Sequence, residues 1–555
     1  MRAAAPTPFD AVELEVLWQS LIATVNEQAK ALQRAAFSPI VREAGDLANA
    51  LFDRRGRMVA QAVTGTPGHI NSLARAAAAI LEEYPPDELE PGDVLITNDP
   101  YKTAGQLLDV TVLSPVWRKP SGGDDARPRV IGFFGSTIHH TDVGGYGIGA
   151  GARDVFEEGL WIPICKLLSR GERNRDVWKF ILSNVRQPDH MAGDLHAQVA
   201  SGEVGAQRLA RLCDDHGLDD IETLADEVIR RSEDATRAAI RALTPGTYHA
   251  SAVLDLADGS VIEIRCAVTV DTEAGEVLVD YAGSSGASPA GINVVRNYTH
   301  AYTTFTVRSV INPEIPNNHG SLAPIKVEAP EGSIVNAVSP APCTARHVVG
   351  MFLPNALLKA LAQVKPEQAM AEGSGAVWTM QVSGSDDAGR PFITAMFTYA
   401  GGVGARAAKP GLSATSYPTG VAAVPIEVVE ASAPVRFLRK ELRPGSGGGG
   451  AQIGGLGQTI EFTVDTARPW QLNAVTSRLA VAPEGIFGGS AGAAGSFAVN
   501  GEPVTTQARV TLRPGDVVRL DLPGGGGYGA GAPSPDAAPY PPPLQPSGRR
   551  DGRVA

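Results

Sequence analysis

The chain has 555 residues, a length that predicts roughly two to four domains, because a single hydrophobic core does not grow to that size. Hydrophobic residues make up 43% of the chain and charged residues 19%, as in ordinary globular proteins. The net charge of −12 argues against a nucleic-acid partner, since contact with phosphates requires a basic face.

The cysteines and the apolar segments indicate a cytoplasmic protein. The four cysteines include no CxxC pair, so we expect neither a thiolate zinc site nor a disulfide framework. The first residues lack the apolar stretch of a signal peptide, and no uninterrupted apolar run is long enough to span a membrane. We therefore predict a cytoplasmic location without membrane association.

The first third of the chain predicts two helices and a β-meander. Residues 10–36 have apolar side chains at helical spacing, with Asp10 as a candidate N-cap. An extended segment with a turn at 53–56 follows, and then a helix at 72–86 that ends at prolines. Segments 93–98, 108–118 and 129–139 are rich in β-branched and aromatic residues and predict three strands.

An antiparallel meander of these three strands brings polar residues to one edge of the sheet, because strand direction alternates. The end of the first strand, the start of the second and the end of the third then lie together. The residues gathered at this edge are Asn98, Asp99, Gln106, Asp109, His139, His140 and Asp142.

The remaining chain predicts an α+β, multi-domain fold. Residues 173–243 read as helices, the pattern changes to strands from 245, and helices recur near 292–311 and 346–364. From 420 the chain is β-rich and full of glycine, and the tail contains seven prolines. We predict an N-terminal domain of β-meander and helices that carries the metal site (1–243), a central α+β domain (244–419), a C-terminal glycine-rich β domain (420–530) and a disordered tail (531–555).

The stretch STIHHTDVGG, residues 136–145, is the main candidate site. Neutral imidazoles and a carboxylate at HxxD and HxD spacing suit zinc, manganese or iron(II). The alternative is a strand end whose histidines bond to the backbone. The expected neighbour Asp109 favours a site.

Other polar stretches have simpler explanations. Asn98 and Asp99 belong to an Asn-Asp-Pro turn, and His69 lies at the predicted start of a helix. Capping or a surface ion pair accounts locally for Glu43 and Asp46 in SPIVREAGDLANALFD. The spacing of Cys343 and His347 permits a thiol and its base, but packing is the favoured explanation.

The glycine runs do not form a nucleotide site. GSGGGGAQIGGLGQ contains no GK[ST], and β-type residues rather than a helix follow it. Tight turns and close backbone packing explain these glycines better. Any ATP that the chemistry requires is therefore expected on another chain.

The sequence resembles the hydantoinase B family, which includes N-methylhydantoinase B subunits, the C-terminal part of 5-oxoprolinases and a subunit of acetone carboxylases. The resemblance covers residues 10–530 through ordered matches, among them SPIVREAGDLANALFD, GDVLITNDPY, HHTDVGG, EEGLWIPICKL, INPEIPNNHG, LRPGSGGGGAQIGGLGQ and LPGGGGYG.

The resemblance implies a subunit of an ATP-dependent complex. An A-type, hydantoinase A-like partner binds ATP and phosphorylates a carbonyl or amide oxygen of a small cyclic amide. The B-type subunit then completes hydrolysis at a divalent metal (zinc, manganese or iron), whose bound water has a lowered pKa. The expected assembly is a hetero-oligomer.

The resemblance also implies the site residues. The family's metal ligands correspond to Asp46, Gln106, Asp109 and His139, with Glu43 as a neighbouring candidate. Asp142 and His140 are the predicted catalytic residues, Asp142 by orienting His139.

Gln106 stands where many relatives have histidine. Three outcomes are open: Gln106 or water fills the ligand position, His140 or His69 substitutes, or the chemistry differs.

The predicted function is that of the B-type subunit of a cyclic amide hydrolase of the hydantoinase or oxoprolinase type. The alternatives are a subunit of a ketone carboxylase acting on acetone or acetophenone, and a non-catalytic scaffold subunit with a decayed metal site.

Overall fold

The computed structural model describes residues 9–63, 66–120, 127–375, 377–506 and 509–531, so the predicted tail lies almost wholly outside the described residues. The fold is multi-domain α+β, as predicted, with four sheets in the described residues. None of the described helices combines the length and the apolar composition needed to cross a membrane.

The N-terminal sheet has seven strands in the order β2-β1-β5-β4-β3-β6-β7. The meander prediction is confirmed, because β3, β4 and β5 pair antiparallel in sequence order. The strands of this sheet are β1 (Leu47–Asp53), β2 (Met58–Gln61), β3 (Val94–Thr97), β4 (Asp109–Arg118), β5 (Arg129–His139), β6 (Cys165–Ser169) and β7 (Glu172–Arg173).

Helices cover both faces of this sheet, so its central strands are buried on both sides. On β1, Leu47 and Leu51 pack in the cluster that includes α1 and α6, whereas Ala50 and Phe52 pack in the cluster that includes α3. The helices in this part are α1 (Ala11–Ala35), α2 (Pro39–Arg42), α3 (Pro67–Glu83), η1 (Pro86–Glu88), α4 (Val155–Glu158), α5 (Arg175–Ser183), α6 (Pro188–Asp215) and α7 (Glu222–Arg241).

Two helix starts follow from capping. The carboxylate of Asp10 accepts hydrogen bonds from the backbone N–H groups of Val12 and Glu13, at 2.9 and 2.8 Å, as expected for the N-cap of α1. Helix α3 begins at Pro67, five residues before the predicted start at 72, because Thr66 caps it and Pro67 fits its first turn. This earlier start places His69 on the first turn of the helix.

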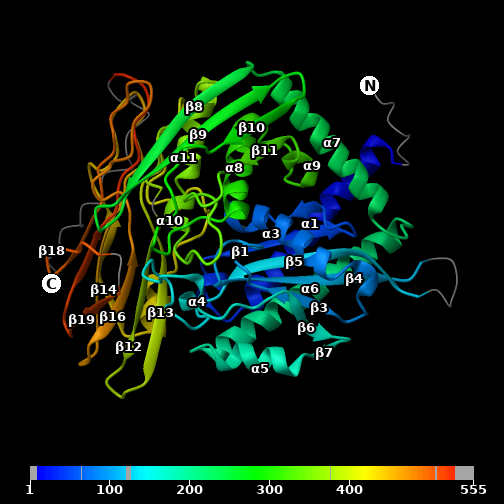
Figure 1. The fold of residues 1–555 in the computed structure, drawn as a ribbon, viewed down its shortest axis with the longest axis horizontal. Coiled ribbons are helices and arrows are strands. Elements are labelled where there is room, and N and C mark those ends of the chain that lie inside the picture. The colour runs from blue at the N-terminus through cyan, green and yellow to red at the C-terminus, as the bar shows by residue number, and fades with distance from the viewer. Residues whose placement is uncertain (1–8, 64–65, 121–126, 376, 507–508, 532–555) are drawn as a thin grey trace, which may run out of the picture.

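The central part packs a four-stranded sheet, in the order β11-β10-β9-β8, against helices. Helix α8 packs on α3 and so connects this part to the N-terminal sheet (Figure 1). The elements are β8 (Gly246–Asp255), β9 (Val261–Asp271), β10 (Glu276–Asp280), α8 (Arg296–Ile311), α9 (His319–Leu322), β11 (Ile325–Glu328), α10 (His347–Gly350), α11 (Leu353–Leu361) and η2 (Pro366–Gln368).

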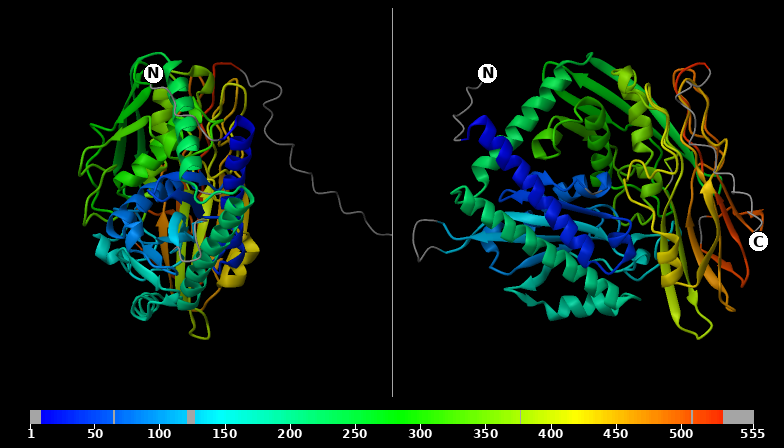
Figure 2. Two further views of the ribbon diagram at one scale, coloured as in Figure 1. Left: turned by 90° about the vertical axis from the view of Figure 1, so that its right-hand side faces the viewer. Right: turned by 180° about the vertical axis from the view of Figure 1, so that it is seen from behind.

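The C-terminal part is a layer of two further sheets on one side of the molecule (Figures 1 and 2). One sheet has the order β13-β12-β16-β19 and the other β14-β15-β20-β17-β18. The elements are β12 (Val377–Ser385), β13 (Pro391–Ala400), α12 (Ile426–Ser432), β14 (Val435–Leu442), β15 (Gln458–Val464), β16 (Trp470–Val475), β17 (Ser496–Val499), β18 (Glu502–Pro503), β19 (Val510–Leu512) and β20 (Val518–Asp521).

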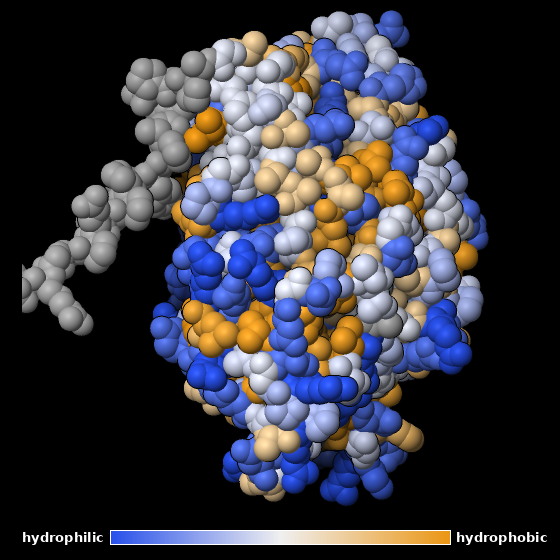
Figure 3. All heavy atoms as spheres, turned by 90° about the vertical axis from the view of Figure 1, so that its left-hand side faces the viewer, coloured by the Kyte–Doolittle hydropathy of each residue, from blue (hydrophilic) through white to orange (hydrophobic). Residues whose placement is uncertain are grey.

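The C-terminal layer encloses its own core and exposes a mixed outer face. Trp378, Trp470 and Phe462 are fully buried in this core. On the outside, hydrophobic patches alternate with hydrophilic side chains (Figure 3).

The first sheet of this layer crosses the boundary predicted at residue 420, since β12 and β13 precede it and β16 and β19 follow it. The largest apolar cluster of the molecule likewise runs from Ile40 to Val475. The predicted domain limits stay a prediction, but the predicted parts share sheets and core.

The glycine runs pack backbone against backbone. A Cβ at Gly402, Gly454 or Gly524 would lie 1.9 Å from the carbonyl oxygen of a neighbouring segment. Such an approach has no room for a side chain. This contact supports the packing role predicted for these glycines.

Candidate functional site

The site begins with a pair of residues on neighbouring strands. Asp109 opens β4 and His139 ends β5, and the two are direct partners in the antiparallel register. Their side chains meet, with the Nδ1 atom of His139 at 2.9 Å from Oδ1 of Asp109. The meander geometry therefore brings together two residues that the sequence predicted to be neighbours.

His69 joins this pair from the first turn of α3, above the same face of the sheet. Its Nε2 atom lies 3.0 Å from Oδ2 of Asp109, and its Nδ1 atom lies 3.2 Å from Oδ1 of Asp46. Asp46 directly precedes β1, and its carbonyl oxygen accepts the backbone N–H of His139. His69, one of the two substitutes considered for the missing imidazole, thus lies between two predicted ligands.

Arg346, in the turn before α10, closes the cluster from the central part of the chain. Its guanidinium forms an ion pair with Asp109 and donates hydrogen bonds to the side-chain oxygen of Gln106 and the carbonyl of Ala104. The amide of Gln106 donates in turn to the carbonyl of Thr344, at 2.6 Å. The guanidinium also stacks on the ring of Tyr298, 4.2 Å from its centroid.

The charges of this cluster fix its hydrogen-bond directions. Burial by itself raises the pKa of Asp109, but the charges of Arg346 and His69 hold that pKa well below its usual value. Because an ionised carboxylate only accepts hydrogen bonds, His69 and His139 both donate to it. Burial lowers the pKa of His69, yet the charges of Asp109 and Asp46 outweigh this and raise it.

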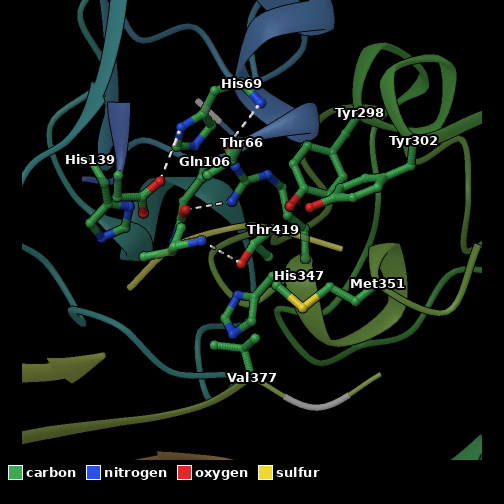
Figure 4. Close-up of a pocket in the computed structure, with 13 residues that line it drawn as sticks. Thr66, His69, Gln106, His139, Tyr298, Tyr302, His347, Met351, Val377 and Thr419 are labelled. Carbon is green, nitrogen blue, oxygen red and sulfur yellow. Dashed lines mark hydrogen bonds and ion pairs between the residues drawn. The ribbon is translucent and has the colours of Figure 1, made fainter. Parts of the chain in front are cut away.

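The side chains of Asp46, His69, Gln106, His139 and Arg346 line a cavity of about 40 Å³, which is enough for water. His69, Gln106 and His139 lie on one side, and Tyr298 and Tyr302 on another (Figure 4). The lining residues are Asp46, Thr66, His69, Gln106, His139, Tyr298, Tyr302, Arg346, His347, Met351, Val377, Thr419 and Val421.

The neighbouring histidine, His140, points away from this cavity. Adjacent residues of a strand face opposite sides of the sheet, and the β-type pairing continues to the N–H of His140, which bonds the carbonyl of Leu108. The imidazole of His140 lies towards α6, where burial lowers its pKa and the charge of Asp194 opposes that shift. The structure therefore separates the predicted catalytic residue His140 from His139.

Asp142, the second predicted catalytic residue, forms a different ion pair. Its carboxylate accepts from the guanidinium of Arg186 at 2.6 Å and from the N–H of Gly144 at 3.0 Å. The carboxylate that orients His139 is that of Asp109. In this structure Asp142 holds the loop after β5.

The remaining candidates have structural roles. Asn98 donates to the carbonyls of Leu107 and Leu160, and Asp99 accepts from the N–H of Tyr101 in a turn. Glu43 forms an ion pair with Arg42. The thiol of Cys343 donates to the carbonyl of Ala341, whereas His347 lies 3.4 Å from the hydroxyl of Thr379.

Sequence analysis missed Arg346, Tyr298 and Tyr302 as site residues. The two tyrosines are one helical turn apart on α8 and contact each other edge to face, with ring centroids 4.9 Å apart. The local signal that could have indicated Arg346 is a charged side chain beside His347 in a largely apolar segment. From the sequence, His347 is considered only as a possible base for Cys343.

The predicted metal ligands do not form a metal site in this arrangement. Both oxygens of Asp109 accept hydrogen bonds, and the oxygen of Gln106 accepts a guanidinium N–H, so a metal ion at this position would meet the positive charge of Arg346. The guanidinium of Arg346 and the imidazole of His69, whose pKa is raised, already compensate the negative charges of Asp46 and Asp109. Across the described ranges, no group of three or more histidine, cysteine, aspartate or glutamate side chains has metal-binding geometry.

Comparison with known proteins supports the resemblance inferred from the motifs. The model of the hydantoinase B/oxoprolinase family matches residues 10–531. The chain belongs to this family.

Three similar proteins illustrate the relationship. A protein assigned as the B component of a D-/L-hydantoinase in Pseudomonas sp. (strain NS671) is 31% identical over 547 residues, which cover 94% of this chain and 90% of that protein. The crystal structure of the ATP-dependent caprolactamase from Pseudomonas jessenii superposes with a TM-score of 0.85 at 26% identity, covering 94% of this chain and 92% of that one. A nucleotide-free acetone carboxylase shares the fold, with a TM-score of 0.81 at 18% identity over 93% of this chain and 75% of that one.

Proposed function

We propose that the chain is the B-type subunit of an ATP-dependent cyclic amide hydrolase. The observation that carries this proposal is the buried cluster in which Asp109 orients His139 beside the cationic Arg346, within one cavity. Family membership and the similarity to a caprolactamase and to a hydantoinase component favour a lactam, hydantoin or imide as substrate.

ATP is proposed to act on an A-type partner subunit. The N–H groups of Gly454, Gly455 and Gly525 donate to backbone carbonyls and so are not available to phosphate, which supports a nucleotide site on another chain. The partner phosphorylates the amide oxygen, and this chain receives the activated ring. The working enzyme is therefore a hetero-oligomer.

His139 is the proposed general base. Since its Nδ1–H donates to Asp109, Nε2 is the ring nitrogen at which His139 would take a proton from water. As water adds to the activated carbon, the proton taken by His139 passes to the ring nitrogen and the C–N bond breaks, leaving an acyl phosphate that a second water hydrolyses to carboxylate and phosphate. Arg346 and His69 provide positive charge beside the phosphorylated oxygen during these steps. Asp46 holds His69 from the opposite side.

The divalent metal stays a prediction of the family resemblance. No step assigned above to His139, Arg346 or His69 depends on it. Asp46, Asp109 and His139 would have to exchange their present contacts to hold it.

The test is reconstitution of the full chain with an A-type subunit. We expect ATP-dependent ring opening of at least one of hydantoin, 5-oxoproline and caprolactam. His139→Asn keeps an N–H for Asp109 but removes the base, and should lower the rate by about 10²- to 10⁴-fold. Arg436→Gln, in an exposed ion pair far along the chain, is the matched control and should leave the rate unchanged.

Three results would contradict the proposal. Bicarbonate-dependent consumption of acetone or acetophenone, without ring opening, would identify a ketone carboxylase subunit. A complex without either activity would favour a scaffold subunit. Full activity of His139→Asn would remove the assigned base even if the ring opens.

A further inference from the structure

A second pocket lies on the other side of helices α3 and α8, between them and β11. It has a volume of about 840 Å³ and shares no lining residue with the cavity of the candidate site. This volume falls within the range of roughly 300–1,000 Å³ that is usual for small-molecule sites. The pocket is large enough for an organic ligand.

Positive charge is concentrated in this pocket. Six arginine and lysine side chains line it, namely Arg55, Arg57, Arg75, Lys102, Arg296 and Lys326, against two carboxylates, Glu82 and Glu328. The whole chain has a net charge of −12, so the pocket runs against the overall charge. Such a local excess attracts anions.

Two of the arginines have no carboxylate partner. Arg55, Arg57 and Lys102 form ion pairs with acidic residues, whereas no ion pair within the described ranges involves Arg75 or Arg296. Arg75 is fixed instead by a hydrogen bond to the side chain of Asn297, at 2.8 Å. Both guanidinium groups line the same pocket. Burial lowers the pKa of Arg75, and the charge of Arg296 lowers it further.

A partly exposed histidine, His300, lies in the same pocket. The Nδ1 atom of His300 is inaccessible to solvent and has no hydrogen-bond partner among the described residues. Burial and the charges of Arg75 and Arg296 lower the pKa of His300 to about 3, so the ring is neutral at physiological pH. A neutral imidazole carries one N–H, which can donate one hydrogen bond to a ligand.

We propose that this pocket binds a phosphate-bearing small molecule, with the phosphate held by Arg75 and Arg296 and by a hydrogen bond from His300. Guanidinium groups bind phosphate oxygens through paired N–H donors, and a dianion compensates two adjacent positive charges. Lys102 and Lys326 add positive charge to the same pocket. The proposal is independent of the amide hydrolase function, because none of its residues lines the site cavity.

The test measures anion binding to the full chain by calorimetry. Inorganic phosphate, AMP and adenosine are compared, with chloride at matched ionic strength as the background. We expect saturable binding of AMP that is tighter than that of adenosine. Tighter binding of AMP than of phosphate indicates an organic phosphate ligand, and equal affinity indicates free phosphate.

Arg75→Gln and Arg296→Gln should each weaken binding by about tenfold or more, the loss of one charge-assisted hydrogen bond. Arg436→Gln, remote from the pocket, should leave the affinity unchanged. Circular dichroism checks that each variant folds. In addition, the Nδ1 resonance of His300, assigned with His300→Gln, should shift on addition of AMP.

Each of three outcomes would overturn the proposal. Absence of saturable binding by both phosphate and AMP excludes a phosphate site. Binding that survives both arginine substitutions in folded protein locates the anion elsewhere. If the substitutions instead weaken only the association with a partner subunit, the pocket is a protein contact and not a small-molecule site.

Discussion

Arg346 is the residue on which the candidate site depends most. Its guanidinium is 2% exposed and meets a carboxylate that is fully buried. Such a pair contributes little net stability, but removal of one partner leaves an uncompensated charge in a medium of low dielectric constant. The site is therefore sensitive to changes in either partner.

Arg346→Met should lower the free energy of unfolding by about 3–5 kcal/mol, because the buried Asp109 keeps only His69 to compensate its charge. Urea denaturation followed by circular dichroism measures the change. The matched control is Arg436→Met, which breaks an ion pair in which both side chains are more than half exposed, and should cost about 1 kcal/mol or less. Equal effects of the two substitutions would contradict the assigned burial cost.

Glu158 provides a prediction for pH. Burial raises the pKa of Glu158 from 4.5 to about 7, although its Oε1 atom accepts the backbone N–H groups of Cys343 and Thr344. A raised carboxyl pKa means that the folded state binds the proton more tightly than the unfolded state. Stability from this group is present below pH 4.5 and is lost as the pH rises through 7.

The loss amounts to about 3 kcal/mol between these limits. Glu158→Gln keeps the acceptor oxygen and removes the titration, so its stability should vary less between about pH 5 and 8. Thermal unfolding across this range measures the difference. Glu157→Gln, at the neighbouring and more exposed position, should retain the wild-type dependence, and an unchanged profile of Glu158→Gln would disprove the assignment.

The metal content of the purified chain tests whether the carboxylates Asp46 and Asp109 are available as metal ligands. Since two carboxylates are already neutralised by Arg346 and His69, the purified chain should hold less than one equivalent of zinc, manganese or iron. Elemental analysis after dialysis against each metal gives the occupancy. One full equivalent that disappears in Asp109→Ala would instead support the family's ligand set.

Part of the site could be predicted from the sequence and part could not. The pairing of Asp109 with His139 follows from strand order, because a short meander fixes which strand ends meet. Arg346 meets Asp109 from a segment far along the chain, and no periodicity within one segment reveals such a contact. The opposite directions of His139 and His140 required the exact strand end, the least certain feature of any sequence pattern.

At the scale of elements, three helices meet at the ring of Tyr298. A Cβ added at Gly68 on α3 or at Gly350 on α10 would lie 2.4 Å from this ring. Both glycines thus leave a slot for the tyrosine of α8. The ring in turn supports Arg346.

Gly350→Ala should push the ring out of its slot, cost about 1–3 kcal/mol and lower ring opening in the reconstituted enzyme. Urea denaturation and the activity assay measure the two effects. In a Tyr298→Ala background the stability cost should disappear, since nothing remains to clash. A stability cost that persists in the Tyr298→Ala background would mean that Gly350 is needed for its backbone conformation and not for the space it leaves to the ring.

At the scale of the whole molecule, the site combines parts far apart in the chain. The cavity takes residues from Asp46 to Val421, and the largest core cluster runs from Ile40 to Val475. Local patterns predicted most helices and strands, because the hydrophobic periodicity of a helix or strand is contained in its own segment of sequence. They did not reveal the sheet that spans residue 420, since β12 and β16 pair although they are distant in sequence.

This shared core predicts that the parts do not fold alone. The fragment 1–243 would expose the apolar surface that α8 and the central sheet cover, and should show no cooperative unfolding. Near-UV circular dichroism and urea titration of the fragment, compared with the full chain, provide the test. A sharp transition in the fragment would show that the N-terminal part is an independent domain.

The backbone contacts at Gly402, Gly454 and Gly524 have a consequence for how the gene can change. Any missense change at these codons inserts a side chain where a carbonyl oxygen already lies, whatever substrate the enzyme uses. Selection on the fold alone is then enough to keep these positions constant. The glycine segments are thus constrained by the packing of the backbone, independently of what the cavity binds.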